Sequence, residues 1–228
     1  MTRRPSPRQI RQAARKAVAI FEQYGLKCCL FGSLACHIYG MKYRDPKDVD
    51  LVVLDNDCGD TELLKTLLAV ADGDFYLVPS RDPDATYRVL YYTVGPGRSC
   101  KVDILTIGSS TSLNLPPVPL ERVRNIHPFV DLPVMPLLPL LLMKIQGWLA
   151  HRESQKVHER AKVLQDAADV RMMLYIAVEK KVHIHDSECG WMPLWFVRQM
   201  KFRVFIFVRE YPDSLEDWNR LGITQTIV

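Results

Sequence analysis

Apolar residues recur at helical and strand spacing along the first part of the chain. Residues 8–24 have apolar side chains every three or four positions, which is typical of a helix with one buried side, and Gly25 ends this pattern. Short apolar runs at 28–31 and 51–54 predict two buried strands, and the second is expected to be central because it is apolar on both faces. A short helix is predicted between them, over 33–39. This alternation indicates an α/β fold.

The middle of the chain continues this alternation and then changes in composition. Leucines on one side predict a helix over 61–70, a strand near 75–78 follows, and Gly95-Pro96-Gly97 divides a predicted hairpin over 87–107. A proline-rich stretch then predicts a connecting segment over 111–136. Beyond it the pattern is helical, at about 137–152, 157–180, 192–210 and 214–220.

The composition is that of a soluble globular chain with a sizeable core. Its 228 residues are 48% hydrophobic and 25% charged, and the net charge of +4 is too small by itself to indicate nucleic-acid binding. The most apolar stretch, 134–143, is shorter than the roughly 20 residues that span a bilayer, so we expect no membrane partner. Six cysteines without C-x-x-C spacing indicate a reducing compartment, and we expect a cytoplasmic protein.

The start of the chain is rich in arginine and poor in acids. Arg8, Arg11 and Arg15 lie on the first predicted helix, mostly opposite its apolar side, and the first acid is Glu22. A start of this kind is also typical of a mitochondrial transit peptide, although this helix leads directly into the first strand. We expect a basic face suited to a phosphate backbone, with a nuclear or mitochondrial location as the alternative to the cytoplasm.

Two aspartates one residue apart are the most informative chemical feature. Asp48 and Asp50 lead into the apolar strand at 51–54, and alternation along a strand places both on one face. With charges roughly 5 Å apart and an effective dielectric of about 20, they repel by about 3 kcal/mol. A divalent cation relieves this repulsion, and oxygen ligands suit Mg²⁺ or Mn²⁺. The pair therefore predicts a metal site.

A third carboxylate interrupts the second strand of the predicted hairpin. Asp103 stands between Val102 and Ile104, where an acid is costly unless it is paired or bound to a metal. A salt bridge with Lys101 or Arg98 is the alternative. Together with the first acid pair, Asp103 predicts a site for two metal ions.

A Gly32-Ser33 turn precedes the acid pair. Gly32 permits a close approach of the backbone, and the first amides of the following helix point at an anion. The Ser33 hydroxyl can donate to a terminal phosphate. Such a turn is common by itself, but ahead of two acids on one face it predicts triphosphate binding.

These segments together resemble the DNA polymerase β-type nucleotidyltransferase superfamily. The resemblance rests on the Gly-Ser turn within 31–35, the Asp-x-Asp strand within 44–53 and the later single Asp within 101–105. It implies a nucleotidyltransferase fold of the α/β (α+β) class, with a short mixed sheet flanked by helices. It also implies a division into a catalytic core, a connecting segment and a helical region that closes the cleft, at 1–110, 111–136 and 137–228.

The helical half is similar to the branch with type IV toxin-like nucleotidyltransferases, in which a Lys and a later Asp-x-x-Asp lie on C-terminal helices. Lys144 and Asp166 match these places, and Arg44 stands four residues ahead of Asp48, one residue wider than in that branch. The resemblance implies that Lys144 holds the β- and γ-phosphates and that Asp166 contacts nucleotide or acceptor. Arg44 is expected to neutralise phosphate. The alternatives are a lysine whose amine reaches solvent and a solvated helix face.

We therefore expect metal-dependent transfer of a nucleotide from an NTP to an acceptor hydroxyl, with release of pyrophosphate. The expected catalytic and metal-binding residues are Asp48, Asp50 and Asp103, and the expected nucleotide-binding residues are Gly32, Ser33, Lys144, Arg44 and Asp166. The 3′ end of an RNA or tRNA is favoured as acceptor because a small molecule needs no basic face. The alternatives are a silent metal-nucleotide-binding protein, AMP or UMP transfer onto a protein or small molecule, and a nuclease, which the order of Lys101 and Asp103 disfavours.

Overall fold

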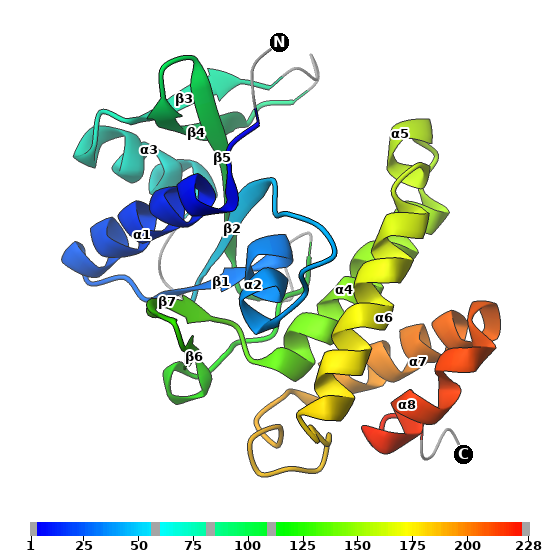
Figure 1. The fold of residues 1–228 in the computed structure, drawn as a ribbon. Helices are drawn as coiled ribbons and strands as arrows, with labels where there is room; N and C mark the ends of the chain where they lie inside the picture. The colour runs from blue at the N-terminus through cyan, green and yellow to red at the C-terminus, as the bar shows by residue number, and fades with distance from the viewer. Residues whose placement is uncertain (1–3, 56–59, 81–84, 109–112, 225–228) are drawn as a thin grey trace. The chain divides into compact units, whose positions relative to one another are not determined.

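The computed structural model describes residues 4–55, 60–80, 85–108 and 113–224 (Figure 1). The chain forms two compact units, of which the first comprises Met1–Ile38 with Lys42–Met135 and the second Tyr39–Met41 with Pro136–Val228. The first unit contains the sheet and the second is helical. No helix among the described residues is long and apolar enough to cross a membrane. The five cysteines that the structure describes are buried and carry free thiols, and Cys58 lies outside the described residues.

Over the described residues, seven strands form one mixed sheet in the order β3-β4-β5-β2-β1-β7-β6. β2 lies at its centre, parallel to β5 and antiparallel to β1, as its two apolar faces predict. The strands have the bounds β1 Cys28–Phe31, β2 Asp48–Val53, β3 Phe75–Pro79, β4 Arg88–Gly95, β5 Arg98–Thr106, β6 Arg124–Ile126 and β7 Phe129–Val134. The predicted α/β fold with a mixed sheet is confirmed.

Three helices accompany the sheet in the first unit: α1 (Pro7–Gln23), α2 (Gly32–Tyr39) and α3 (Thr61–Ala71). α1 begins with a capping box between Ser6 and Gln9, which satisfies two backbone amides that the helix itself leaves unpaired. Its apolar side packs on β2, β4 and β5, and α3 packs beside it on β3, β4 and β5 (Figure 1). The two helices thus cover one face of the sheet.

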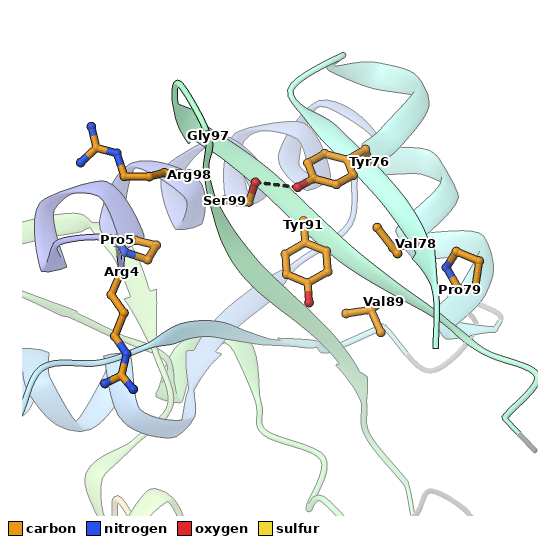
Figure 2. Close-up of a pocket in the computed structure, with 10 residues that line it drawn as sticks. All are labelled: Arg4, Pro5, Tyr76, Val78, Pro79, Val89, Tyr91, Gly97, Arg98 and Ser99. Atoms are coloured by element: carbon orange, nitrogen blue, oxygen red, sulfur yellow. Dashed lines mark hydrogen bonds between the residues drawn. The ribbon is translucent and has the colours of Figure 1, made fainter. Parts of the chain in front are cut away.

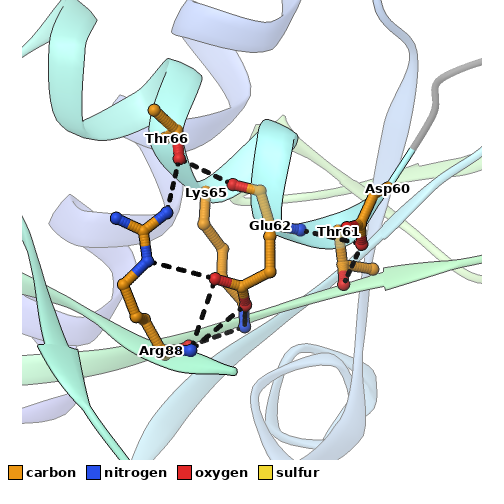
Figure 3. A network of polar contacts seen from close by, with 6 residues as sticks. All are labelled: Asp60, Thr61, Glu62, Lys65, Thr66 and Arg88. Atoms are coloured by element: carbon orange, nitrogen blue, oxygen red, sulfur yellow. Dashed lines mark hydrogen bonds and ion pairs between the residues drawn. The ribbon is translucent and has the colours of Figure 1, made fainter. Parts of the chain in front are cut away.

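A network of charged side chains fastens α3 to the start of β4 (Figure 3). Glu62 accepts a hydrogen bond from Lys65 Nζ at 2.7 Å and one from Arg88 Nε at 3.2 Å. Lys65 also donates to the carbonyl of Arg88, and Asp60 caps the helix by accepting from the amide of Glu62. Burial alone would raise the pKa of Glu62, but these bonds from Lys65 and Arg88 lower it below its usual value. α3 is thereby tied to the first residue of β4.

Alternation along the strands gives the sheet two chemically different faces. Val49 and Leu51 of β2 are buried, as are Cys100 and Val102 of β5. The side chains between them are at least partly exposed and form what we call the polar face, which includes Tyr76, Tyr91, Ser99, Lys101, Asp103, Asp48 and Asp50. Because strand registers pair members of this set with one another, the polar face is continuous from β3 to β2.

The second unit is built from α4 (Leu137–Glu153), α5 (Val157–Arg160), α6 (Val163–Glu179), α7 (Leu194–Glu210) and α8 (Leu215–Arg220), with a 3-10 turn at Pro212–Ser214. α4 is apolar on nearly all sides, and it packs against both α6 and α7. Trp148 of α4 meets Phe207 of α7 edge to face, with 4.9 Å between ring centroids. Fully buried aromatic side chains thus form the core of this unit.

The structure differs from the sequence prediction at two places. The segment 111–136, predicted as a connection, contributes a short 3-10 turn (Leu120–Arg122) and the strands β6 and β7 to the edge of the sheet. β6 has only three residues, and Pro133 interrupts β7, so neither has the β-branched run that marks a strand in a sequence. The helix predicted over 157–180 is divided into α5 and α6.

Candidate active site

The three predicted carboxylates lie on the polar face of two neighbouring parallel strands. Asp50 of β2 is in register with Asp103 of β5, and Asp48 is in register with Lys101. Residues in register on neighbouring strands point to the same side of a sheet. The fold thus brings together acids that are far apart in the chain.

Gly32 lies directly against the carboxylate of Asp50. Phe31, the last residue of β1, is paired with Asp50, and the chain then turns into α2 at Gly32 with a φ of +61°. A Cβ atom on residue 32 would lie 1.8 Å from Asp50 Oδ2, which no side chain tolerates. Ser33 Oγ donates a long hydrogen bond of 3.4 Å to Asp48 Oδ1. The predicted phosphate-binding turn therefore contacts both acids of the pair, from the β1 side.

Lys101 carries the positive charge of this site. Its Nζ atom lies 2.7 Å from Asp103 Oδ2, so the salt bridge that the sequence offers as the alternative for Asp103 is present. Burial alone would lower the pKa of Lys101, but the negative charge of Asp103 and the hydrogen bond to it raise that pKa above its usual value, and Asp48 and Asp50 add to this effect. All three carboxylates therefore stabilise the charged form of Lys101.

Cys100, the buried neighbour of Lys101, is affected by the same three negative charges. Burial, and after it the charges of Asp48, Asp50 and Asp103, together raise the pKa of the Cys100 thiol to about 12. A thiol with so high a pKa is protonated and is not a nucleophile at neutral pH. Negative potential is therefore concentrated at this part of β5.

The donor set fits a divalent cation in its chemistry, since it consists of carboxylates and already attracts the ammonium group of Lys101. Hard oxygen ligands of this kind are those that Mg²⁺ and Mn²⁺ prefer. In the described part of the chain, however, no group of three or more His, Cys, Asp and Glu side chains is placed to hold a metal ion. Ligation of one ion by all three acids therefore requires that their side chains move closer together.

Arg44 lines a cavity that adjoins the acid pair along the chain. The cavity has a volume of about 410 Å³ and is lined by Arg4, Pro5, Arg44, Asp45, Pro46 and Lys47, the last of which directly precedes Asp48. Three of its lining side chains are cationic and one is acidic. Arg44 thus lines a largely cationic cavity, and its role in neutralising phosphate stays a prediction.

Lys144 and Asp166 belong to the second unit, and each has an ionic contact there. Lys144 Nζ of α4 lies 2.9 Å from Asp169 Oδ2 of α6, and Asp169 is fully buried. Asp166 lies 2.6 Å from Nδ1 of His151, a partner that the sequence pattern did not indicate. The Lys144 side chain is only 16% exposed, so it does not reach freely into solvent. The roles that the resemblance implies for Lys144 and Asp166 stay predictions.

The arginines of α1 are less available than their sequence positions suggest. Arg15 forms an ion pair with Asp131 of β7, and the guanidinium of Arg11 lies 4.6 Å from the ring centroid of Phe129. Arg8 and Arg15 are both exposed, and Arg11 is partly buried. The predicted basic face of the first helix is thus largely used in fastening α1 to β7.

Replacement of Gly32 by alanine should displace Asp50 and strain the turn. We expect a loss of about 2 kcal/mol or more in the free energy of unfolding, because the added Cβ meets the carboxylate and a positive φ disfavours alanine. Urea denaturation measures this loss of stability. Gly73→Ala is the control, since a Cβ at Gly73 has no neighbour within 4 Å. Equal stability of the two variants would contradict the close contact at Gly32.

Replacement of Lys101 by methionine should make stability depend on divalent cations. Without Mg²⁺ we expect the melting temperature to fall by roughly 2–4 °C, since about 1 kcal/mol is a usual value for a half-exposed ion pair. Mg²⁺ should then raise the melting temperature more in this variant than in the wild type. Lys27→Met, at an exposed lysine of the same unit, is the control. A Mg²⁺ response equal in all three proteins would argue against a cation site at the carboxylates.

Replacement of Lys144 by methionine should destabilise the second unit. Asp169 would lose an ammonium partner while remaining buried, and breaking a buried pair typically costs about 3–5 kcal/mol. The double variant Lys144→Met/Asp169→Asn should recover much of this loss, as followed by urea denaturation. If Lys144→Met instead kept its stability and lost nucleotide affinity, the phosphate-binding role implied by the resemblance would be favoured.

Proteins of known structure resemble this chain to different degrees. A crystal structure of an antigenic nucleotidyltransferase-like protein from Paracoccidioides brasiliensis superposes with a TM-score of 0.65 at 16% sequence identity, over 94% of each chain. The antibiotic-resistance factor ANT(2'')-Ia gives a TM-score of 0.36 at 12% identity, over 75% of this chain and 97% of the other. Terminal uridylyl transferase 4 from Trypanosoma brucei, solved with bound GTP, gives 0.33 at 15% identity, over 78% and 52%.

The first of these similarities carries the assignment of the fold, because the other two superpose too loosely to support an argument. No protein-family model matches the sequence. A search of curated proteins also gives no match. The protein has the fold of a nucleotidyltransferase-like protein, in agreement with the fold that its sequence predicts.

Proposed function

We propose that this protein is a nucleotidyltransferase that moves a nucleotide from an NTP to an acceptor hydroxyl and releases pyrophosphate. The observation that carries the proposal is the contact between Gly32 and Asp50. It sets the first turn of a helix directly against two carboxylates that share one face, with a third carboxylate in register beside them. Anion-binding amides next to cation-binding acids suit a metal-bound triphosphate. The shared fold supports this choice of chemistry.

Asp48, Asp50 and Asp103 are the proposed ligands of Mg²⁺ or Mn²⁺. When bound, such ions stabilise the charge that develops on the attacking and leaving oxygens of an in-line displacement. Gly32 and Ser33 hold the triphosphate through the first amides of α2 and the serine hydroxyl. Asp103 orients the acceptor hydroxyl and accepts its proton.

Charge balance explains why nucleotide and cation are expected to bind together. Three carboxylates and one lysine leave the site negative, so a free triphosphate would be repelled. Arg44 and Lys47 line the adjoining cavity and offset part of that repulsion. Lys101 supplies a further positive charge, which becomes free to meet phosphate when it parts from Asp103.

The finer parts of the proposal concern the acceptor and the relatives of the protein. We propose the 3′ hydroxyl of an RNA or tRNA as acceptor and a cytoplasmic location, with transfer of AMP or UMP onto a protein or small molecule as the alternative. Membership of the type IV toxin-like branch, with Lys144 and Asp166 as nucleotide contacts, is part of the same proposal. A protein that binds metal and nucleotide without turnover is the remaining alternative, and release of pyrophosphate distinguishes it.

Asp48→Asn, Asp50→Asn and Asp103→Asn should each lower transfer by about 10²–10³-fold or more, since each removes a charge that acts on the reacting phosphate. Without Mg²⁺, the melting temperatures of Asp48→Asn and Asp50→Asn should be unchanged or higher, because each change relieves repulsion. Transfer is measured with each labelled NTP against total RNA and cell lysate, together with pyrophosphate release.

Asp60→Asn is the matched control for these three variants. Asp60 caps α3, and asparagine caps a helix about as well as aspartate, so this variant should keep both stability and transfer. Wild-type transfer by any of the three site variants would show that the assignment of the carboxylates is wrong.

A further inference from the structure

Two tyrosines lie in one row with the proposed site. The strand registers pair Tyr76 with Tyr91, Tyr91 with Lys101, and Lys101 with Asp48. All four therefore project from the polar face, side by side across β3, β4, β5 and β2. Two strand spacings separate Tyr91 from Asp48, which is on the order of 10 Å.

The tyrosines border a cavity of about 490 Å³ (Figure 2). Their rings are stacked, with 5.8 Å between centroids and 21° between planes. Tyr76 is held in place by a 2.5 Å hydrogen bond between its hydroxyl and Ser99 Oγ, and 39% of this residue is exposed. A stacked aromatic pair of this kind contributes to strand pairing, but the open cavity beside it also offers ring surface to a ligand.

The charged side chains that line this cavity are both cationic. Arg4 and Arg98 lie to one side of the tyrosine pair (Figure 2). Arg4 and Pro5 also line the 410 Å³ cavity that contains Arg44. We call the 490 Å³ cavity, with its two tyrosines and two arginines, the groove.

The position of the groove relative to the carboxylates indicates whether it would bind the nucleotide donor or the acceptor. Gly32 and Ser33 contact the acids from the β1 side, where the proposed triphosphate and its leaving pyrophosphate belong. In an in-line displacement the attacking oxygen comes from the opposite side. The groove starts on that opposite side, beyond β5 on β4 and β3. Its position therefore matches the acceptor.

We propose that this groove binds a single-stranded polynucleotide acceptor, with unpaired bases stacked on Tyr91 and Tyr76 a few nucleotides before the 3′ hydroxyl. Its backbone follows Arg98 and Arg4. Cations that track a backbone, combined with aromatic rings that stack bases, are the usual means of holding single strands. The inference rests on the proposed function for the position of the 3′ end, whereas binding in the groove stands without it.

The test is fluorescence anisotropy with a labelled, unstructured single-stranded RNA of about 12 nucleotides, without NTP or divalent cation. Tyr91→Leu should raise the Kd about five- to hundredfold, because base stacking is lost while an apolar side chain remains on the strand. Tyr91→Phe should retain wild-type affinity. Tyr24→Leu, at an exposed tyrosine outside the groove, should leave the Kd unchanged. Equal affinity of Tyr91→Leu and wild type would overturn the proposal.

The arginines give an independent readout in the dependence of affinity on salt. Arg4→Gln and Arg98→Gln should each lower the slope of log K against log salt by about 0.7, the value for one phosphate contact on a single strand. Arg15→Gln should leave the slope unchanged, since Arg15 is already paired with Asp131. A change of slope in Arg15→Gln alone would place the polynucleotide on α1 and overturn the groove.

Further outcomes separate this inference from the proposed function. Displacement of the RNA by free NTP, with loss of NTP affinity in Tyr91→Leu, would make the groove a nucleotide-base site and overturn the inference alone. Preference for a duplex of the same length would also overturn it. RNA binding that depends on Tyr91, in a protein that releases no pyrophosphate with any NTP, would support the groove and refute the enzyme. The same measurement with single-stranded DNA of equal length tests whether the protein distinguishes ribose from deoxyribose.

Discussion

The absence of a side chain at Gly32 is the constraint on which the rest of the site depends. The carboxylate of Asp50 occupies the space that a Cβ atom of residue 32 would fill. This contact fixes the end of β1 against β2 and sets the first turn of α2, with its unpaired amides, beside the acid pair. The close approach is possible only because residue 32 also adopts a positive φ. Gly32 therefore meets two requirements at once, the positive φ of the turn and the space for the Asp50 carboxylate.

The balance of charge on the polar face is a second constraint on the site. Three carboxylates gather on two adjacent strands, and Lys101 offsets part of their repulsion through its contact with Asp103. The ion pair is half-exposed, so solvent screens it and its exchange for another cation costs little. The pair of Lys144 and Asp169 in the second unit is different, because Asp169 is fully buried. A buried carboxylate of this kind cannot change partner without a large cost in free energy.

The same face also links the proposed chemistry to the proposed substrate. Alternation along β3, β4 and β5 turns Leu90, Tyr92 and Cys100 into the core under α1 and α3, and turns their neighbours Tyr91 and Lys101 outward. The core therefore determines which residues are left for function. A one-residue slip in register would bury Lys101 and expose Val102. The order of cations, rings and acids across the sheet is a consequence of how the strands pack.

The sequence by itself determined most of the elements and predicted the residues of the site. Periodicity located α1 and the hairpin of β4 and β5, and residue types alone indicated that Gly32, Asp48, Asp50 and Asp103 belong to one kind of site. These inferences depend on local geometry, in which side-chain direction follows from position along a helix or strand. The strands β6 and β7 could not be found in this way, because β6 has only three residues and Pro133 interrupts the pattern of β7.

Only the tertiary structure decided which residues meet. It paired Lys101 with Asp103. It also placed Asp131 beside Arg15, which had been expected on a free basic face. Strand register, finally, brought Tyr76 and Tyr91 into the row of residues that ends at Asp48. Partners of this kind lie on different strands and helices. Their pairing depends on strand order and register, which are set by long-range packing and leave no local pattern in a single sequence.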